Sequence, residues 1–273
     1  MALGETLLEL QQLTERLRRD CPWDREQTAR TIVPHTIEEA YEVADAALAD
    51  DRAKLLDELG DLLFQVYFLA LLLQEQGEGD LEQVARRVHE KLVRRHPHVF
   101  GEAEARTPAR VRERWETIKT EQEGREGVFH DVPDSLPALL RARKVQRRAA
   151  AVGYDWPDLD GPAEKVREEL AELLAEVARA GRPRPETEPD RRVEAELGDL
   201  LFTIVNLARF LNVDPELALR ATTQRFVARV ELAERLAAEA GETWTELDLD
   251  GQERWYGRAK AALLAPADTQ RAP

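Results

Sequence analysis

The sequence predicts an all-α protein made of two tandem helical repeats. Apolar residues recur at the spacing of amphipathic helices, as at Leu7, Leu10 and Leu13, and no useful length of sequence shows the alternation of a strand. The heptapeptide ELGDLLF occurs twice, at residues 58–64 and 196–202. A recurrence of this length indicates an internal duplication.

Composition limits the function classes. The chain has 273 residues, 43% of them hydrophobic and 34% charged, which is typical of a folded domain and too apolar for a disordered one. No apolar run of about 18 residues and no signal peptide are present, so we expect a cytoplasmic protein without a membrane partner. A net charge of −15 argues against a broad nucleic-acid interface. The single cysteine, Cys21, excludes a disulfide framework.

The duplication sets the expected domain organisation. We expect an N-terminal repeat over 1–120, a linker over 121–137 that is rich in Glu, Gly, Asp and Pro, a C-terminal repeat over 138–264, and a tail over 265–273. Each repeat contains a helix that is apolar nearly all round, at 62–73 and 200–211. Helices of one repeat can hardly cover such a surface, which predicts bundles completed by dimerisation.

Two local patterns predict where one helix begins and which face of another is exposed to solvent. Thr36 has Glu39 three residues later, a capping-box pattern that predicts a helix from Thr36 to about Ala49. The basic stretch from Arg141 to Arg148 is typical of a solvated helix face.

Each copy of ELGDLLF is preceded by the pattern Glu-Glu-x-x-Glu. Positions three apart share a helix face, so if the two helices of a repeat face each other, four carboxylates converge. The two expected sets are Glu39, Glu42, Glu58 and Asp61, and Glu169, Glu172, Glu196 and Asp199. Such clusters need a hard cation, and an all-oxygen donor set suits Mg²⁺ or Mn²⁺ better than zinc or iron. A di-iron bundle is excluded because Glu42 and Asp61 stand where histidine would be required.

Basic and aromatic residues follow each acidic set at repeated spacings. They are Lys91 and Arg95 with Trp115 and Lys119 in the first half, and Arg225 and Arg229 with Tyr256 and Lys260 in the second. Cations at a four-residue spacing share a helix face and can hold a polyphosphate. The segment RRHPHVF also holds His96 and His98, but two histidines around a proline at a helix end are more often structural than metal-binding.

Glu-Glu-x-x-Glu followed by Glu-x-x-Asp, the loop CPWDREQT, the segment RRHPHVF and the tandem repeat resemble the MazG family of nucleoside triphosphate pyrophosphohydrolases, which are all-α NTP pyrophosphatases. The resemblance implies Mg²⁺-dependent hydrolysis of NTPs and dNTPs to the monophosphate and pyrophosphate, in helical bundles completed by dimerisation. It implies that the two carboxylate sets are metal ligands and that Glu38 and Glu168 orient or deprotonate water. The basic residues would then meet phosphates, with Trp115 near the nucleotide.

The second copy departs from this pattern at its aromatic residue. Trp255 lies five residues before Lys260, and only Tyr256 has the spacing of four that relates Trp115 to Lys119. The aromatic contact of the second copy therefore rests on Tyr256.

A rival hypothesis is a non-catalytic helical scaffold or regulatory partner-binding protein whose acidic clusters hold structural cations, because a fold can persist without activity. Phosphate-binding cations beside both acidic sets favour the enzyme.

Overall fold

The computed structural model describes residues 3–101, 127–129, 132–181 and 188–264. Every regular element in these ranges is helical and none is a strand, so the predicted all-α class is confirmed. The chain divides into two compact units, residues 1–130 and 131–273, which meet inside the segment expected to be the linker.

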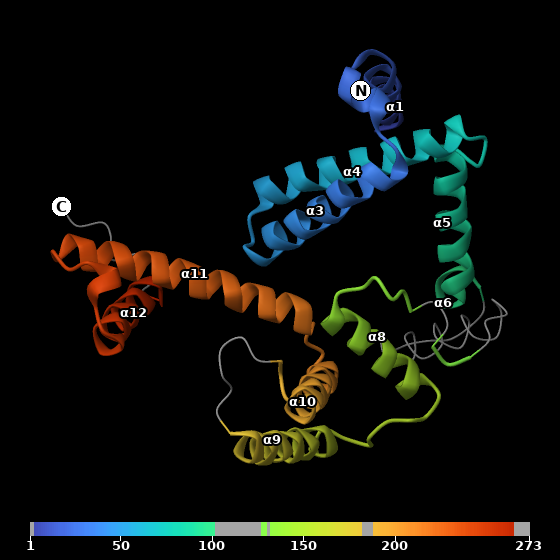
Figure 1. The fold of residues 1–273 in the computed structure, drawn as a ribbon. Helices are drawn as coiled ribbons and strands as arrows, with labels where there is room; N and C mark the ends of the chain where they lie inside the picture. Colours follow the sequence, from blue (N-terminus) through green and yellow to red (C-terminus); the bar gives the residue numbers. More distant parts are fainter. Residues whose placement is uncertain (1–2, 102–126, 130–131, 182–187, 265–273) are drawn as a thin grey trace. The chain divides into compact units, whose positions relative to one another are not determined.

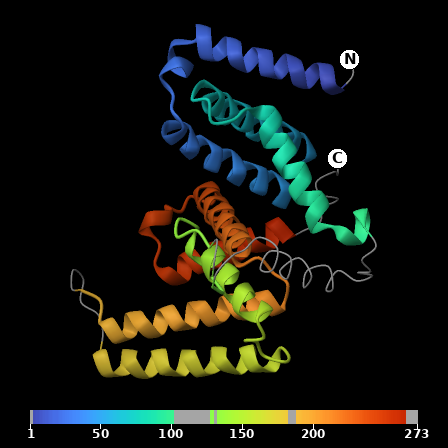
Figure 2. The same cartoon turned by 90° about the vertical axis from the view of Figure 1, so that its right-hand side faces the viewer.

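The first unit is built on an antiparallel pair of long helices, α3 and α4, which lie side by side in both views (Figures 1 and 2). Over residues 3–101 its helices are α1 (Leu3–Asp20), α2 (Pro22–Glu26), α3 (Ala29–Leu48), α4 (Arg52–Glu75), α5 (Leu81–Arg95) and α6 (Pro97–Phe100). Three helices begin at a polar N-cap residue. The side chains of Thr28, Asp51 and Asp80 each accept a hydrogen bond from the backbone N–H of the third residue of α3, α4 and α5, respectively. The pair is closed by a three-residue connection in which Asp50 has a φ of 52°.

The start of α3 differs from the sequence-based expectation. The capping box is formed by Thr28 and Thr31, so the helix begins at Ala29 and continues through Pro34 instead of starting after Thr36. Thr36 instead donates its hydroxyl to the carbonyl of Ile32 within the helix. The additional turns carry Ile32 into the core, where it packs with Phe68 and Leu72.

The second unit repeats the helical pair as α9 and α10, which again lie side by side (Figure 2). Its elements are α8 (Ala138–Ala151), α9 (Asp160–Ala180), α10 (Arg191–Phe210), α11 (Pro215–Glu239), the 3-10 helix η1 (Trp244–Glu246) and α12 (Leu249–Leu264). A second cluster, at the contact of α11 with α12, is formed by Ala233, Ala237, Trp255 and Ala259. In both repeats, the acidic residues therefore lie on an equivalent pair of packed helices.

Helix α8 is not the solvated basic face that its sequence suggested. Arg148 is buried, Arg143 forms an ion pair with Asp214 before α11, and Gln146 donates to the carbonyl of Phe202 on α10 at 2.7 Å. Arg143 and Gln146 of this helix therefore join it to the start of α11 and to α10, which the charge pattern alone does not predict.

Large apolar side chains remain exposed on the central helices of both units. Examples are Leu56 and Leu59 on α4, Leu197 and Leu201 on α10, and Phe226 on α11, each at least 46% exposed. An apolar surface of this kind is typical of an interaction face. Within the described ranges, no helix is long and apolar enough to cross a membrane.

Candidate metal centres of the two repeats

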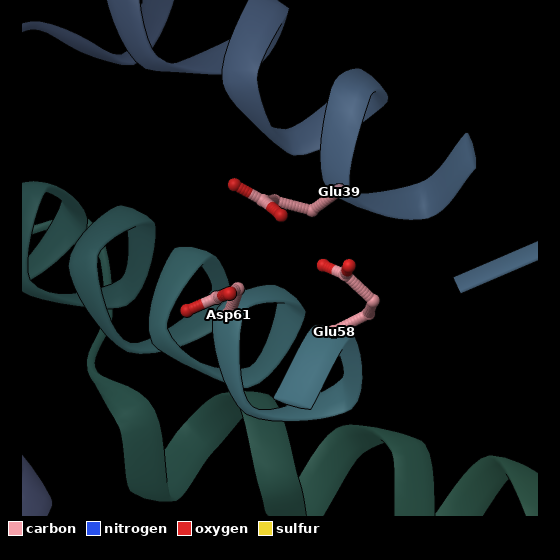
Figure 3. Close-up of side chains that lie close together, drawn as sticks. All are labelled: Glu39, Glu58 and Asp61. Atoms are coloured by element: carbon pink, nitrogen blue, oxygen red, sulfur yellow. The ribbon is translucent and has the colours of Figure 1, made fainter. Parts of the chain in front are cut away.

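The first candidate site lies between α3 and α4. One carboxylate oxygen from each of Glu39, Glu58 and Asp61 lies within 4.8 Å of the others, and Figure 3 shows the three side chains converging from the two helices. Glu58 and Asp61 share a face of α4 because they are three residues apart. Packing of α3 against that face supplies Glu39. We call this set the first carboxylate group.

The second candidate site has the same construction on α9 and α10. One oxygen from each of Glu169, Glu196 and Asp199 again lies within 4.8 Å of the others. Glu169 is buried, Glu196 is half-buried and Asp199 is exposed, so this second carboxylate group opens to solvent on one side. In the ranges that the structure describes, these two are the only groups of three or more potential metal ligands.

Burial and the crowding of negative charge raise the proton affinity of one carboxylate in each group. Burial, and then the charges of Asp61 and Glu42, raise the pKa of Glu39, and a hydrogen bond with Glu42 adds to the effect. Burial, and then the charges of Glu172 and Asp199, raise the pKa of Glu196. A divalent cation would relieve this repulsion, and the all-oxygen donors fit a hard ion such as Mg²⁺. The residues present therefore fit the metal that the resemblance implies.

Two predicted ligands lie beside the groups without being part of them. Glu42 is close enough to hydrogen-bond to Glu39, and Glu172 is the leading charge acting on Glu196. Their role as ligands stays a prediction.

Glu38 and Glu168, the first acid of each Glu-Glu-x-x-Glu pattern, are exposed and approach different side chains. Glu38 Oε2 lies 3.6 Å from Nδ1 of His35, whereas Glu168 Oε1 lies 2.9 Å from Nζ of Lys165. Lys165 also lies 2.7 Å from Glu169, and these hydrogen bonds, that to Glu169 first, raise the pKa of Lys165. Sequence reasoning missed Lys165, although a lysine four residues before an acid on one helix is a recognisable pairing signal.

The predicted phosphate-binding residues lie on other helices. Lys91 and Arg95 are on α5, Arg225 and Arg229 are on α11, and Lys260 is on α12. In the described part of the chain, no hydrogen bond or ion pair joins Lys91, Arg229 or Lys260 to either carboxylate group, and Arg225 donates to Thr222. Trp115 and Lys119 lie outside the described residues.

The aromatic residues of the second repeat have separate environments. Trp255 is buried, and its Nε1 donates to Glu242 at 2.8 Å. Tyr256 is half-buried, with its ring centroid 5.9 Å from that of Phe226 on α11. Tyr256 is thus the more accessible of the two. Its place near a nucleotide stays a prediction.

The histidines of the RRHPHVF segment lie close together with tilted rings, and both lie outside the two carboxylate groups. The ring centroids of His96 and His98 are 5.5 Å apart, and Nδ1 of His96 lies 2.6 Å from the carbonyl oxygen of Leu92. This geometry fits the structural interpretation of the pair.

Comparison with known proteins agrees with the duplicated fold and its carboxylate sites. The family model described as the MazG nucleotide pyrophosphohydrolase domain matches twice, at residues 27–100 and 162–235. The chain is 42% identical over 94% of its length to a nucleoside triphosphate pyrophosphohydrolase of Escherichia coli K12, and covers 96% of that protein. It is also 41% identical over 92% of its length to the nucleoside triphosphate pyrophosphohydrolase/pyrophosphatase MazG of Thermotoga maritima, covering 94% of it.

A more distant relative matches less of the chain. The nucleoside triphosphate pyrophosphohydrolase of Mycobacterium tuberculosis H37Rv is 31% identical over 62% of this chain and 50% of its own length.

The fold, the carboxylate groups and these matches define a metal-dependent hydrolase of the all-α class. The chain belongs to the MazG nucleotide pyrophosphohydrolase family, in the form with two tandem domains. The resemblance noted from the sequence is thereby confirmed, and the chain is an enzyme of this family.

Proposed function

We propose that this enzyme hydrolyses nucleoside triphosphates, both NTPs and dNTPs, to the monophosphate and pyrophosphate with Mg²⁺, or Mn²⁺ in its place. The observation that carries the proposal is the pair of matching carboxylate groups, each built by two helices of a MazG domain. The names of the relatives supply the substrate class.

The proposed ligands are the four acids predicted in each repeat. A bound divalent ion would neutralise charge on the triphosphate and make water a better nucleophile. The carboxylates of Glu39, Glu58 and Asp61 would hold that ion, with Glu42 at the edge of the group. Glu169, Glu196 and Asp199 would do the same in the second repeat, with Glu172 beside them.

The exposed acids Glu38 and Glu168 would orient the attacking water and accept its proton. Each directly precedes the first ligand on its helix and is exposed, so its carboxylate is accessible to water. The water oxygen would form a bond to the α-phosphorus while the bond from that phosphorus to the bridging oxygen breaks, and pyrophosphate would leave with the electron pair. An orienting acid adds to the rate because it fixes the direction of attack.

The cationic residues would hold the triphosphate tail. These are Lys91, Arg95 and Lys119 in the first repeat and Arg225, Arg229 and Lys260 in the second, with Trp115 and Tyr256 near the nucleotide. Helix α5 leaves the C-terminal end of α4 steeply, whereas Glu58 and Asp61 lie in the N-terminal half of α4 (Figure 1). A further element is therefore needed to complete the phosphate side of the site.

We infer that a second copy of the chain supplies that element in a homodimer. The apolar faces of α4 and α10 are exposed, and α5 buries none of its side chains despite the apolar pair Val88 and Leu92. Burial of these faces against another copy would stabilise the assembly by roughly 25 cal/mol per Å² of apolar surface. We place this enzyme in the cytoplasm, without a nucleic-acid or membrane partner, acting in control or house-cleaning of the nucleotide pool.

A product analysis tests the proposal. The purified chain is incubated with a panel of NTPs and dNTPs and Mg²⁺, and the products are resolved by ion-exchange chromatography. We expect monophosphate and pyrophosphate in equal amounts, and none without a divalent ion. Diphosphate with orthophosphate as first products would refute the reaction. A complete lack of turnover with every nucleotide would favour the non-catalytic scaffold.

A further inference from the structure

Glu242 joins the end of α11 to α12, which packs beside the C-terminal part of α11 (Figure 1). Its backbone N–H donates to the carbonyl oxygen of Ala237 at 2.9 Å, and Gly241 just before it has a φ of 81°, a geometry typical of a helix C-terminus. One carboxylate oxygen, Oε2, accepts from Nε1 of Trp255 at 2.8 Å and from Arg254 at 2.6 Å. The Glu242 side chain therefore ties α12 to a point that is fixed on α11.

Trp255 is the buried contact of α12 with α11. It is only 5% exposed and packs against Ala233 and Ala237 of α11, and Ala259, one turn later on α12, is buried with it. The indole N–H is the polar group of this side chain, and a buried N–H needs an acceptor. Glu242 supplies that acceptor.

Tyr256 and Lys260 share the neighbouring face of α12. Tyr256 is half-buried beside Phe226 of α11, and Lys260 is exposed. Successive residues are about 100° apart around a helix, so a rotation of α12 by that angle would bring Tyr256 into the place of Trp255. Lys260 would then turn inward in the place of Ala259, because both pairs have a spacing of four.

The hydrogen bond to Glu242 distinguishes the two rotations of α12. Trp255 and Tyr256 are both large aromatic residues, so an aromatic ring at the contact does not by itself define the rotation. The donor that meets Glu242 is the indole N–H of Trp255, and this contact keeps Lys260 at the surface.

We propose that Glu242 is a positioning residue of the second repeat: through Trp255 it fixes the rotation of α12, so that Tyr256 and Lys260 are presented to the triphosphate. This inference rests on the proposed function, because it assumes that these two residues contact the nucleotide. Glu242 itself touches no substrate. Loss of its hydrogen bond therefore weakens substrate binding and leaves the carboxylates on α9 and α10 in place.

Steady-state kinetics of the full chain test the proposal. Asp61→Asn is present in every protein, so that hydrolysis by the second repeat is measured, and the substrate is the triphosphate that the wild type hydrolyses fastest. Glu242→Leu removes the acceptor and should raise KM by roughly threefold or more, with kcat changed by less than about twofold. Pyrophosphate release measures both constants.

A spectroscopic readout follows the contact without reference to activity. In protein labelled with ¹⁵N at tryptophan, the indole N–H signal of Trp255 is assigned by its absence in Trp255→Phe. Glu242→Leu should shift this signal and speed its exchange with solvent, because the N–H loses its acceptor.

Three further variants serve as controls. Glu242→Gln keeps an acceptor oxygen and should hold KM within about twofold of its starting value, whereas Trp255→Phe keeps a ring, removes the donor and should raise KM as Glu242→Leu does. Adding Glu242→Leu to Trp255→Phe should have little further effect, since both changes remove one hydrogen bond. Glu239→Leu replaces another exposed acid at the end of α11 and should change KM by less than about twofold.

The outcomes separate this inference from the proposed function. An unchanged KM in Glu242→Leu while the Trp255 signal moves, or an equal rise of KM in Glu239→Leu, would overturn the positioning role and leave the proposed function intact. Loss of all turnover with Asp61→Asn alone would also overturn it, because the second repeat would then not hydrolyse the substrate. A wild type without turnover of any nucleotide would refute the proposed function, and this inference with it. Circular dichroism verifies folding, and Trp255→Phe carries the test if Glu242→Leu is not folded.

Discussion

Arg18 on α1 and Glu75 at the end of α4 form a two-pronged ion pair, with Nε to Oε1 and Nη2 to Oε2 both at 2.8 Å. Arg18 also donates to the carbonyl oxygens of Asp24 and Gln27, so one guanidinium group joins α1, the short helix α2 and α4. The hydrogen bond from Arg18 lowers the pKa of Glu75. The ion pair's contribution to stability is fully present above the ordinary pKa of a glutamate, and it is lost as the pH falls through the lowered pKa of Glu75.

Arg18→Met should lower the free energy of unfolding at pH 7 by about 1–3 kcal/mol, because it removes the ion pair and the side-chain hydrogen bonds to the carbonyl oxygens of Asp24 and Gln27. Glu75→Gln should cost less, about 1 kcal/mol, since the donors to the carbonyls remain. Urea denaturation measures both. Glu78→Gln, in the turn after α4, is the control and should be near neutral; equal losses in all three variants would contradict the role of the pair.

The raised pKa values of Glu39 and Glu196 predict a pH dependence of stability. Because these groups hold protons in the folded state at a pH where the unfolded chain has released them, their contribution to stability is fullest below the ordinary value of 4.5 and is lost as the pH rises through the folded values. Without divalent ions, the wild type should therefore lose more stability between about pH 4.5 and 7 than the Glu39→Gln/Glu196→Gln protein. Chemical denaturation across this range measures the difference.

Saturating Mg²⁺ should reduce that loss of stability in the wild type, because the cation favours the ionised carboxylates. The glutamine protein is the control and should respond much less. An identical pH profile for the two proteins without metal would contradict the raised pKa values that burial and neighbouring charges give these two carboxyl groups.

Each repeat is expected to bind metal and to contribute separately to hydrolysis. Asp61→Asn and Asp199→Asn keep the size of the side chain and remove one ligand charge, so each should abolish its own site and leave the other. Calorimetric titration with Mg²⁺ and the rate of pyrophosphate release measure the two effects. If one change eliminates all turnover and the other leaves the rate intact, one repeat is structural.

The exposed apolar faces predict a homodimer that depends on α10. Leu201→Glu should dissociate or weaken the dimer, because it places a charge on a leucine that is 47% exposed in the single chain and would be covered in the assembly. Light scattering at micromolar concentration measures the mass. Leu264→Glu, at the end of α12, is the matched control and should leave the mass unchanged. A stable wild-type monomer of 31.0 kDa would refute the dimer.

The carboxylate pairs could be predicted from the sequence because their geometry is local. Glu58 and Asp61 must share a face of α4, and Glu196 and Asp199 a face of α10, wherever the helices pack. The contacts of Glu42 with Glu39 and of Glu172 with Glu196 could not be predicted, because they depend on how one helix is rotated against the other. Helical periodicity says nothing about that rotation.

Other features were missed because two local signals competed. Pro34 favours a helix boundary, yet the capping box of Thr28 with Thr31 starts α3 earlier and leaves Pro34 inside it. Lys165 was missed because the acidic pattern alone does not show which basic residue on the same helix face pairs with it. Arg143 and Arg148 showed that a basic run can serve tertiary packing, which charge pattern alone does not reveal.

The two helical hairpins are closed by connections of unequal length: three residues join α3 to α4, and ten join α9 to α10. In the short connection Asp50 already adopts a left-handed conformation, so an added residue would have to shift one helix along the other and move Glu39 away from Glu58. The longer connection can absorb added residues at a small entropic cost. A peptide epitope or a fluorophore-labelling tag is therefore better inserted between α9 and α10, where the enzyme can be tracked or immobilised without moving either set of carboxylates.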